Sequence, residues 1–166
     1  MKRILAMLVV LVMSACGAAA FAADREAMSD GYSIEGMPNP VEEQLSLEAL
    51  SRRVGFEVSV PERLGEFERT SLSSIDTLAQ MIYMHGDQEL CYRISPADGG
   101  DNSGDYNDYA FVTFESANGV SVLLKGNDNR VCLALWSLNG YDYSVGIREK
   151  GVSMDEMFSI LDELGI

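Results

Sequence analysis

The side chains that most often perform catalysis are sparse in this chain. Histidine occurs once, at His85, beside a predicted turn at Gly86. Ser-His-Asp and Cys-His chemistry would both have to use this one side chain, and no Gly-x-Ser-x-Gly motif is present to hold a nucleophile. One histidine excludes a multi-histidine zinc site, three cysteines are too few for a thiolate-rich one, and no glycine-rich nucleotide loop is present. We therefore expect a protein that is not an enzyme and that carries no cofactor.

Carboxylates are the one abundant chemical group. The chain has 26 Asp and Glu residues against 12 Lys and Arg residues. Glycoside hydrolases use two carboxylates about 5–10 Å apart across a cleft. A secreted hydrolase acting through a carboxylate pair is therefore the enzymatic alternative.

The most distinctive polar segment is the loop from Ser95 to Asp108, which is rich in Gly, Asp and Asn. Hard oxygen ligands on a flexible segment are typical of calcium sites. The candidate calcium ligands are Asp98, Asp101, Asp105 and Asp108. The loop is not an EF-hand, because counting from Asp101 places Tyr106 at the sixth position and Val112 at the twelfth. Two hypotheses stay open, a calcium-stabilised module and a solvated connection between strands.

Three aromatic residues are candidates for ligand contact. Tyr106 and Tyr109 lie in or beside the polar loop, and Trp136 lies in the apolar segment 133–138. Long loops are disproportionately functional. The alternative for all three is packing onto the core.

Cys91 and Cys132 are the only cysteines outside the N-terminal segment. A disulfide between them is permitted in an oxidising compartment and would add roughly 4 kcal/mol of stability. In a sequential meander their strands would be three positions apart, about 14 Å, whereas a disulfide needs Cα atoms within about 7 Å. A bridge therefore requires a curled sheet or a strand order that is not sequential.

The N-terminus has the pattern of a bacterial signal peptide, predicted over residues 1–22. Lys2 and Arg3 precede an unbroken apolar run of ten residues, Ile4 to Met13, and small residues follow. Spanning a bilayer takes about 20 residues. We expect export from the cytoplasm, with no transmembrane span left after processing.

Two processing hypotheses stay open. Ala20-Phe21-Ala22 is a small-x-small site for cleavage before Ala23. Residues 13–16 resemble a lipobox, in which Cys16 would carry a lipid anchor. The protein is accordingly secreted, or tethered to a membrane as a lipoprotein.

The remainder of the chain predicts one acidic domain. Residues 23–40 mix charge, Gly and Pro without periodicity, which is typical of a flexible arm or tether, and residues 41–166 are sufficient for a single core. The formal net charge is −14. A field of this sign opposes binding to nucleic acid.

Helix signals occur at both ends of the domain. Ser46 is a predicted N-cap of a short helix that ends at Gly55, and Ser153 with Glu156 forms a capping box for a C-terminal helix. Apolar residues of the second helix lie at helical spacing, which indicates packing against a sheet.

Between the helices the pattern predicts short strands joined by tight turns. Asn118-Gly119 and Asn139-Gly140 are strong hairpin signals. Alternation places Val112 and Phe114 on one side of their strand. The predicted strands cover residues 56–60, 75–84, 90–94, 109–115, 120–125, 131–138 and 141–147. The expected fold is α+β, an antiparallel meander of five to seven strands with an N-terminal and a C-terminal helix packed on one face.

The order of several short motifs resembles a group of exported bacterial proteins built on a domain of unknown function. The motifs are Asn39-Pro40, Val54-Gly55-Phe56, Val60-Pro61, the segment 103–107, Lys125-Gly126, the segment 134–136 and the final Ser153-Met-Asp-Glu helix. Similar domains form extracytoplasmic parts of some anti-sigma factors. The resemblance implies no catalytic residue, and this chain lacks the other parts that an anti-sigma factor needs.

The sequence therefore predicts a non-catalytic extracytoplasmic binding domain or cell-envelope accessory domain. Its expected partner is a protein or small-molecule ligand outside the cytoplasm, of a kind that the sequence does not name.

Overall fold

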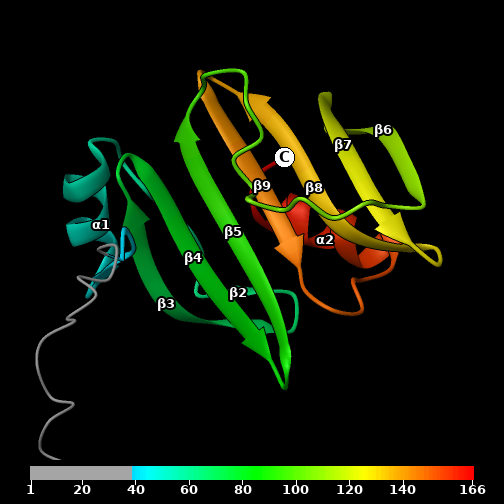
Figure 1. Cartoon of the computed structure of the whole chain (residues 1–166), viewed down its shortest axis with the longest axis horizontal. Helices are drawn as coiled ribbons and strands as arrows, with labels where there is room; N and C mark the ends of the chain where they lie inside the picture. The colour runs from blue at the N-terminus through cyan, green and yellow to red at the C-terminus, as the bar shows by residue number, and fades with distance from the viewer. Residues whose placement is uncertain (1–38) are drawn as a thin grey trace, which may run out of the picture. The chain divides into compact units, whose positions relative to one another are not determined.

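Nine antiparallel strands form one sheet in the computed structural model, which describes residues 39–166 (Figure 1). Along the sheet the order is β1-β3-β4-β5-β9-β8-β7-β6, and β2 also pairs with β3. The strands are β1 (Glu42–Gln44), β2 (Arg63–Leu64), β3 (Phe67–Ile75), β4 (Leu78–His85), β5 (Gln88–Pro96), β6 (Phe111–Ala117), β7 (Val120–Asn127), β8 (Arg130–Leu138) and β9 (Tyr141–Ile147). With two helices, the predicted α+β class is confirmed.

Three predictions concern residues outside this description. The signal peptide over residues 1–22, lipidation of Cys16, and all but the last two residues of the arm over residues 23–40 lie outside the described residues. They stay predictions.

Both helices begin at the residues that their capping signals predicted. In α1 (Leu47–Val54) the Ser46 hydroxyl accepts a hydrogen bond from the Ala49 amide, and Gly55 ends the helix with φ of 87°. In α2 (Met154–Glu163) Ser153 and Glu156 form the reciprocal capping box. A helix that starts at a satisfied cap needs no tertiary partner to define its first turn.

The two asparagine–glycine turns also form as predicted. Asn118 and Gly119 have φ of 48° and 87°, and Asn139 and Gly140 have 52° and 83°. Positive φ at both central residues is the geometry of the tight hairpin turn that matches strand twist.

The predicted strands were wrong in two places. Residues 56–60 are not a strand, because the Val58 amide bonds to the Ser51 hydroxyl instead of to a neighbouring strand, while the Val58 side chain is buried. Residues 75–84 are not one strand, because Asp76 turns the chain with φ of 54° between β3 and β4. The polar sequence of β3 carries no clear apolar alternation, so β3 was missed.

The strand order differs from a sequential meander. Strands β3, β4 and β5 form one meander and β6 to β9 form another, and the two join where β9 pairs with β5. The prediction of five to seven sequential strands was therefore wrong in number and in order.

The prediction of an N-terminal and a C-terminal helix packed on one face of the sheet was wrong in its placement of the helices. The strand β1 precedes α1, and α1 contacts β1, β3 and β4, whereas α2 contacts β6 and β8. Fully buried side chains from helices and strands form a single cluster, including Leu50, Met81, Tyr83, Leu90, Leu124, Val145, Met157 and Leu161.

Gly126 occupies a point of close approach in β7. A Cβ atom there would lie 2.0 Å from the Arg130 carbonyl oxygen and 2.6 Å from the Phe111 ring. Gly146 in β9 is a strand glycine with free space around it, because a Cβ atom there would have Leu133 as its nearest neighbour, at 3.9 Å.

We expect Gly126→Ala to lower the free energy of unfolding by about 2–3 kcal/mol, because the added methyl group forces a backbone shift in a packed sheet. Gly146→Ala should cost less than about 1 kcal/mol, since the methyl group only reaches ordinary contact. Urea unfolding of both variants measures the difference. Equal effects would contradict the role assigned to Gly126.

Candidate functional site

The connection between β5 and β6, residues 97–110, crosses one face of the sheet. In Figure 1 it passes in front of β9, β8 and β7, while α2 lies behind them. We call the crossed face the loop face. The crossing is required because β6 lies at the far edge of the sheet from β5.

Arg93 of β5 is the main side chain that holds this loop. Its guanidinium donates hydrogen bonds to the backbone oxygens of Asn102 and Ser103, at 3.2 and 2.5 Å, and to the Gln80 side chain at 2.9 Å. A Cβ atom on Gly104 would lie 2.4 Å from the same guanidinium, and Gly104 has φ of 65°. A side chain at position 104 would therefore collide with Arg93, and glycine leaves the space that the guanidinium occupies.

Asp142 of β9 holds the start of the loop and is 5% exposed. One carboxylate oxygen accepts from the Asp98 amide at 3.2 Å, and the other accepts from the Ser137 hydroxyl. Its backbone oxygen accepts from the Asn102 side chain at 2.8 Å. Sequence analysis missed Arg93 and Asp142, although each is a charged residue inside a predicted apolar strand.

The aspartates of the loop form a series of turns. The side chains of Asp98, Asp101, Ser103 and Asp105 each accept a hydrogen bond from the amide two residues later, at 2.8–3.1 Å. These are Asx- and Ser-type turns, in which a short polar side chain replaces a backbone acceptor. Local backbone geometry alone therefore accounts for much of the Asp and Ser content of this loop.

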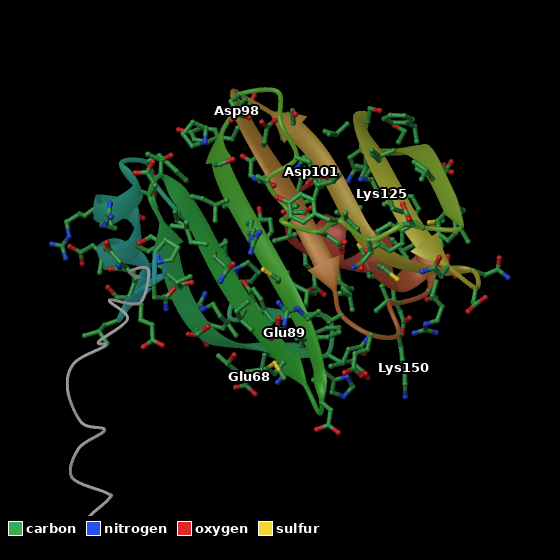
Figure 2. All side chains as sticks on the ribbon, viewed as in Figure 1. Glu68, Glu89, Asp98, Asp101, Lys125 and Lys150 are labelled. Carbon is green, nitrogen blue, oxygen red and sulfur yellow. The ribbon has the colours of Figure 1, made fainter. Side chains whose placement is uncertain are left out.

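Asp101 also contacts the sheet. Its second carboxylate oxygen lies 3.4 Å from the Lys125 ammonium, and Figure 2 shows the two side chains beside each other. No group of three or more His, Cys, Asp or Glu side chains within residues 39–166 is arranged to hold a metal ion. Calcium binding through Asp98, Asp101, Asp105 and Asp108 stays a prediction.

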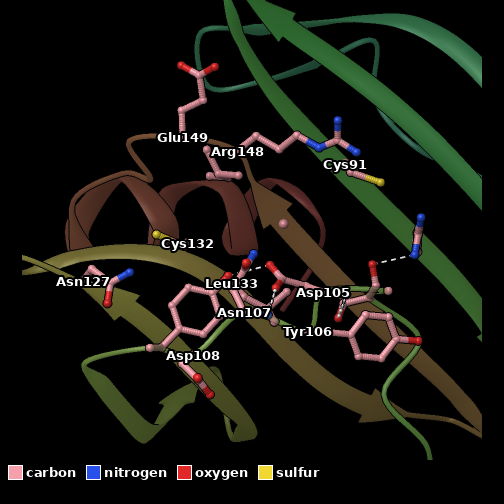
Figure 3. Close-up of a pocket in the computed structure, with 16 residues that line it drawn as sticks. Cys91, Asp105, Tyr106, Asn107, Asp108, Asn127, Cys132, Leu133, Arg148 and Glu149 are labelled. Atoms are coloured by element: carbon pink, nitrogen blue, oxygen red, sulfur yellow. Dashed lines mark hydrogen bonds between the residues drawn. The ribbon is translucent and has the colours of Figure 1, made fainter.

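One hollow lies on one side of the loop (Figure 3). It has a volume of about 790 Å³ and is lined by Cys91, Asp105, Tyr109, Cys132, Arg148 and Glu149 among others. We call it the thiol hollow. Burial raises the pKa of the Cys91 thiol, so that this thiol is protonated at neutral pH.

The hypothesis of a disulfide between Cys91 and Cys132 is corrected, because both thiols are free. The strand β9 lies between them, and its Gly146 pairs with Cys91 on one side and with Leu133 on the other. Two strand spacings are about 10 Å, which exceeds the reach of a disulfide. Figure 3 shows the two cysteines on separate strands.

The three aromatic candidates lie in different environments. Tyr106 is 96% exposed, while Tyr109 is half-buried and donates to Asp105. Burial, and then the hydrogen bond to Asp105, raise the pKa of Tyr109 above its ordinary value. Trp136 is 5% exposed and stacks on Tyr143 with ring centroids 5.3 Å apart. The structure therefore does not bring Tyr106, Tyr109 and Trp136 together into one site.

A second hollow lies on the other side of the loop. It has a volume of about 730 Å³ and is lined by Asp101, Phe114, Leu123, Lys125, Leu135 and Asp142, and Trp136 borders it. We call it the apolar hollow. Its floor continues a row of cross-strand neighbours that runs from Gln80 through Arg93, Ser144, Leu135 and Leu123 to Phe114. The row changes from polar to apolar along its length.

The side of β6 on which alternation places Val112 and Phe114 is exposed. Val112 is 59% exposed and Phe114 is 71% exposed, whereas Phe111 packs against the core and Ala117 is buried in it. We call Val112 and Phe114 the β6 strip. Neither residue was predicted as a site residue, because alternation does not show which face of a strand is covered.

The lone histidine lies away from both hollows. His85 ends β4, is 3.4 Å from the Glu66 carboxylate, and meets the Phe67 ring edge-on. Neither contact supplies a nucleophile for His85 to activate.

Comparison of the chain with models of known protein families, with curated proteins and with solved structures finds no match in any of the three. The resemblance to exported bacterial proteins therefore stays a prediction. Within residues 39–166, neither helix has the length and apolar character needed to cross a membrane.

The fit between Arg93 and Gly104 predicts an energetic coupling. We expect Arg93→Ala to cost about 1.5–3 kcal/mol of unfolding free energy, because charge-assisted hydrogen bonds to the loop are lost. Gly104→Ala should cost about 1–3 kcal/mol in the wild type, because it strains the backbone and displaces the guanidinium. In the Arg93→Ala background only the backbone strain remains, about 1–2 kcal/mol. Urea unfolding of the four proteins tests the cycle, and additive effects would exclude the coupling.

The pKa of Asp101 predicts a loss of stability in acid. Burial acts to raise this pKa, but hydrogen bonds from Ser103 and the Lys125 ammonium outweigh it, so that the pKa lies below its ordinary value of 3.8. The stabilisation is present above pH 3.8 and is lost as the pH falls through the lower folded-state value.

We therefore expect the stability difference between the wild type and Asp101→Asn to shrink as the pH falls from neutral to about 2. Urea unfolding across this range measures it. Asp108→Asn is the control, because the Asp108 side chain is exposed and makes no hydrogen bond with any described residue. A difference that grows in acid would contradict the assignment.

Proposed function

We propose that this chain is a non-catalytic binding domain that acts outside the cytoplasm and takes an apolar ligand in the apolar hollow. The observation that carries the proposal is the exposure of Phe114. Its surface is 71% open to solvent, and Leu123 and Leu135 follow it in the same cross-strand row. Soluble proteins rarely expose contiguous apolar surface, and where they do, it often marks an interaction site.

The lining of the hollow suits a ligand that is mainly apolar with one polar end. Phe114, Leu123 and Leu135 supply apolar surface, and the Lys125–Asp101 ion pair lies at the border with the loop. A volume of about 730 Å³ is in the range of small-molecule sites, which combine apolar walls with few polar groups. Arg93 and Asp142 hold the loop, which lines one side of the hollow, in place before any ligand arrives.

Action outside the cytoplasm rests on the sequence alone. The apolar run 4–13 with its basic start and small-residue end supports export. The absence of a second histidine and of a nucleophile motif supports a role in binding instead of turnover.

The uncharged dye Nile red is a suitable probe for the apolar hollow. We expect the exported form, from Ala23 onward, to bind it saturably with a rise in fluorescence. Phe114→Ser should weaken binding about tenfold, because it removes the buried contact of one aromatic ring. Tyr106→Ser is the matched control, since Tyr106 is 96% exposed and lines the thiol hollow instead. Equal binding by all three proteins would overturn the proposal.

A further inference from the structure

The two edges of the sheet are protected differently. Along β3 one edge is covered by the short strands β1 and β2, of three and two residues. The other edge is β6, which has seven residues and pairs only with β7 among the described strands (Figure 1). An exposed edge strand of this length presents free amide and carbonyl groups to another strand, unless charge, proline or a bulge blocks it.

The sequence of β6 contains almost none of these protections. Phe111 to Ala117 has no proline, no lysine and one charged residue, Glu115. Its register with β7 is regular from end to end, without a bulge. The strand is therefore open to pairing.

The hairpin turn shows which backbone groups face the open edge. Ala117 and Val120 flank the two-residue turn, so they form a hydrogen-bonded pair, and such pairs alternate along an antiparallel ladder. Val112, Phe114 and Ser116 consequently form non-hydrogen-bonded pairs with β7. Their amide and carbonyl groups point outward.

We propose that β6 pairs with β6 of a second copy of this chain, antiparallel and centred on Thr113, so that two sheets become one. In this register Val112 lies opposite Phe114 of the partner subunit, and Thr113 lies opposite Thr113 of the partner subunit. Pairs of aromatic with β-branched residues and pairs of threonines both stabilise neighbouring strands. The outward groups of Val112 and Phe114 meet outward groups of the partner and satisfy them.

Other registers are less favourable. Centring on Glu115 places two carboxylates directly opposite each other, which destabilises a pair of strands. Centring on Phe114 places Val112 opposite Ser116 of the partner subunit and loses both mixed aromatic pairs. The Thr113 register places Glu115 opposite Phe111 of the partner subunit and opposes no charges.

Charge distinguishes a second copy from a basic peptide at this edge. The nearest charged side chain on the face of the β6 strip is Lys125, which is paired with Val112 across the ladder, and Glu115 lies on the other face. The positive and negative charges near this edge are thus equal in number. This favours pairing with β6 of a second copy over pairing with a lysine-rich peptide. The full chain has a formal net charge of −14, and the exported form loses Lys2 and Arg3 and no acidic residue, which leaves −16. Two copies therefore repel at long range, so salt should strengthen the pairing.

The first test is sedimentation equilibrium of the exported form. We expect a monomer–dimer equilibrium with a dissociation constant on the order of 10–100 µM. It should tighten several-fold between about 50 and 500 mM NaCl, because salt screens the repulsion. Val112→Pro should weaken it at least tenfold, because it removes one outward amide, while Val112→Ala keeps this amide and should weaken it less. Thermal unfolding confirms that both variants fold.

The second test reads out the register through disulfide formation. Thr113→Cys should form a disulfide-linked dimer under mild oxidation, because residues in a facing non-hydrogen-bonded pair have Cα atoms about 4.5 Å apart. Glu115→Cys is the matched control, since it lies on the same side of β6 and faces Phe111 of the partner subunit. The unsubstituted protein gives the background of Cys91 and Cys132.

Three results would overturn the proposal. They are a monomer throughout the concentration range, a self-association that weakens with salt as attraction between opposite charges does, and cross-linking by Glu115→Cys instead of Thr113→Cys. The dimer and the ligand-binding proposal fail separately, because Thr113 faces away from the apolar hollow and Nile red binding does not depend on it.

Discussion

The pairing of β5 with β9 is the contact on which the rest of the structure depends. It joins two meanders through residues about 50 positions apart, from Leu90 with Ile147 to Pro96 with Tyr141. Because β9 takes the place beside β5, β6 is displaced to the far edge, four strand spacings or about 19 Å away. The chain must cover that distance across a sheet face, and residues 97–110 are long enough to do so.

The crossing explains the polar composition of the loop without reference to a ligand. A segment that crosses the face of a sheet cannot form the backbone hydrogen bonds that join neighbouring strands. Its amide and carbonyl groups therefore need other partners. Arg93 and Asp142 supply partners from below, and the aspartates supply them from within the loop by bonding two residues ahead. The acidity of this segment therefore has a structural role as well as an electrostatic one.

The same crossing divides the loop face into a covered part and an open part. The loop lies across the middle of that face and lines one side of the apolar hollow, whereas Phe114, in the same cross-strand row as Leu123 and Leu135, stays exposed. The strand β6 is also the last strand of its sheet, so it has an open edge as well as an uncovered face. The apolar hollow and the β6 edge are thus two results of one topological constraint.

Local structure was determined by the sequence alone. Ser46, Ser153 with Glu156, and the two Asn-Gly turns form as predicted, because each depends on residues within one turn of the chain. Alternation also showed that Val112 and Phe114 share a side. Only the tertiary structure decided that this side faces solvent, that Cys91 and Cys132 are separated by β9, and that Arg93 holds the loop. These outcomes follow from which distant strands pair, and a two-residue period carries no information about the strand or the layer that a face will meet.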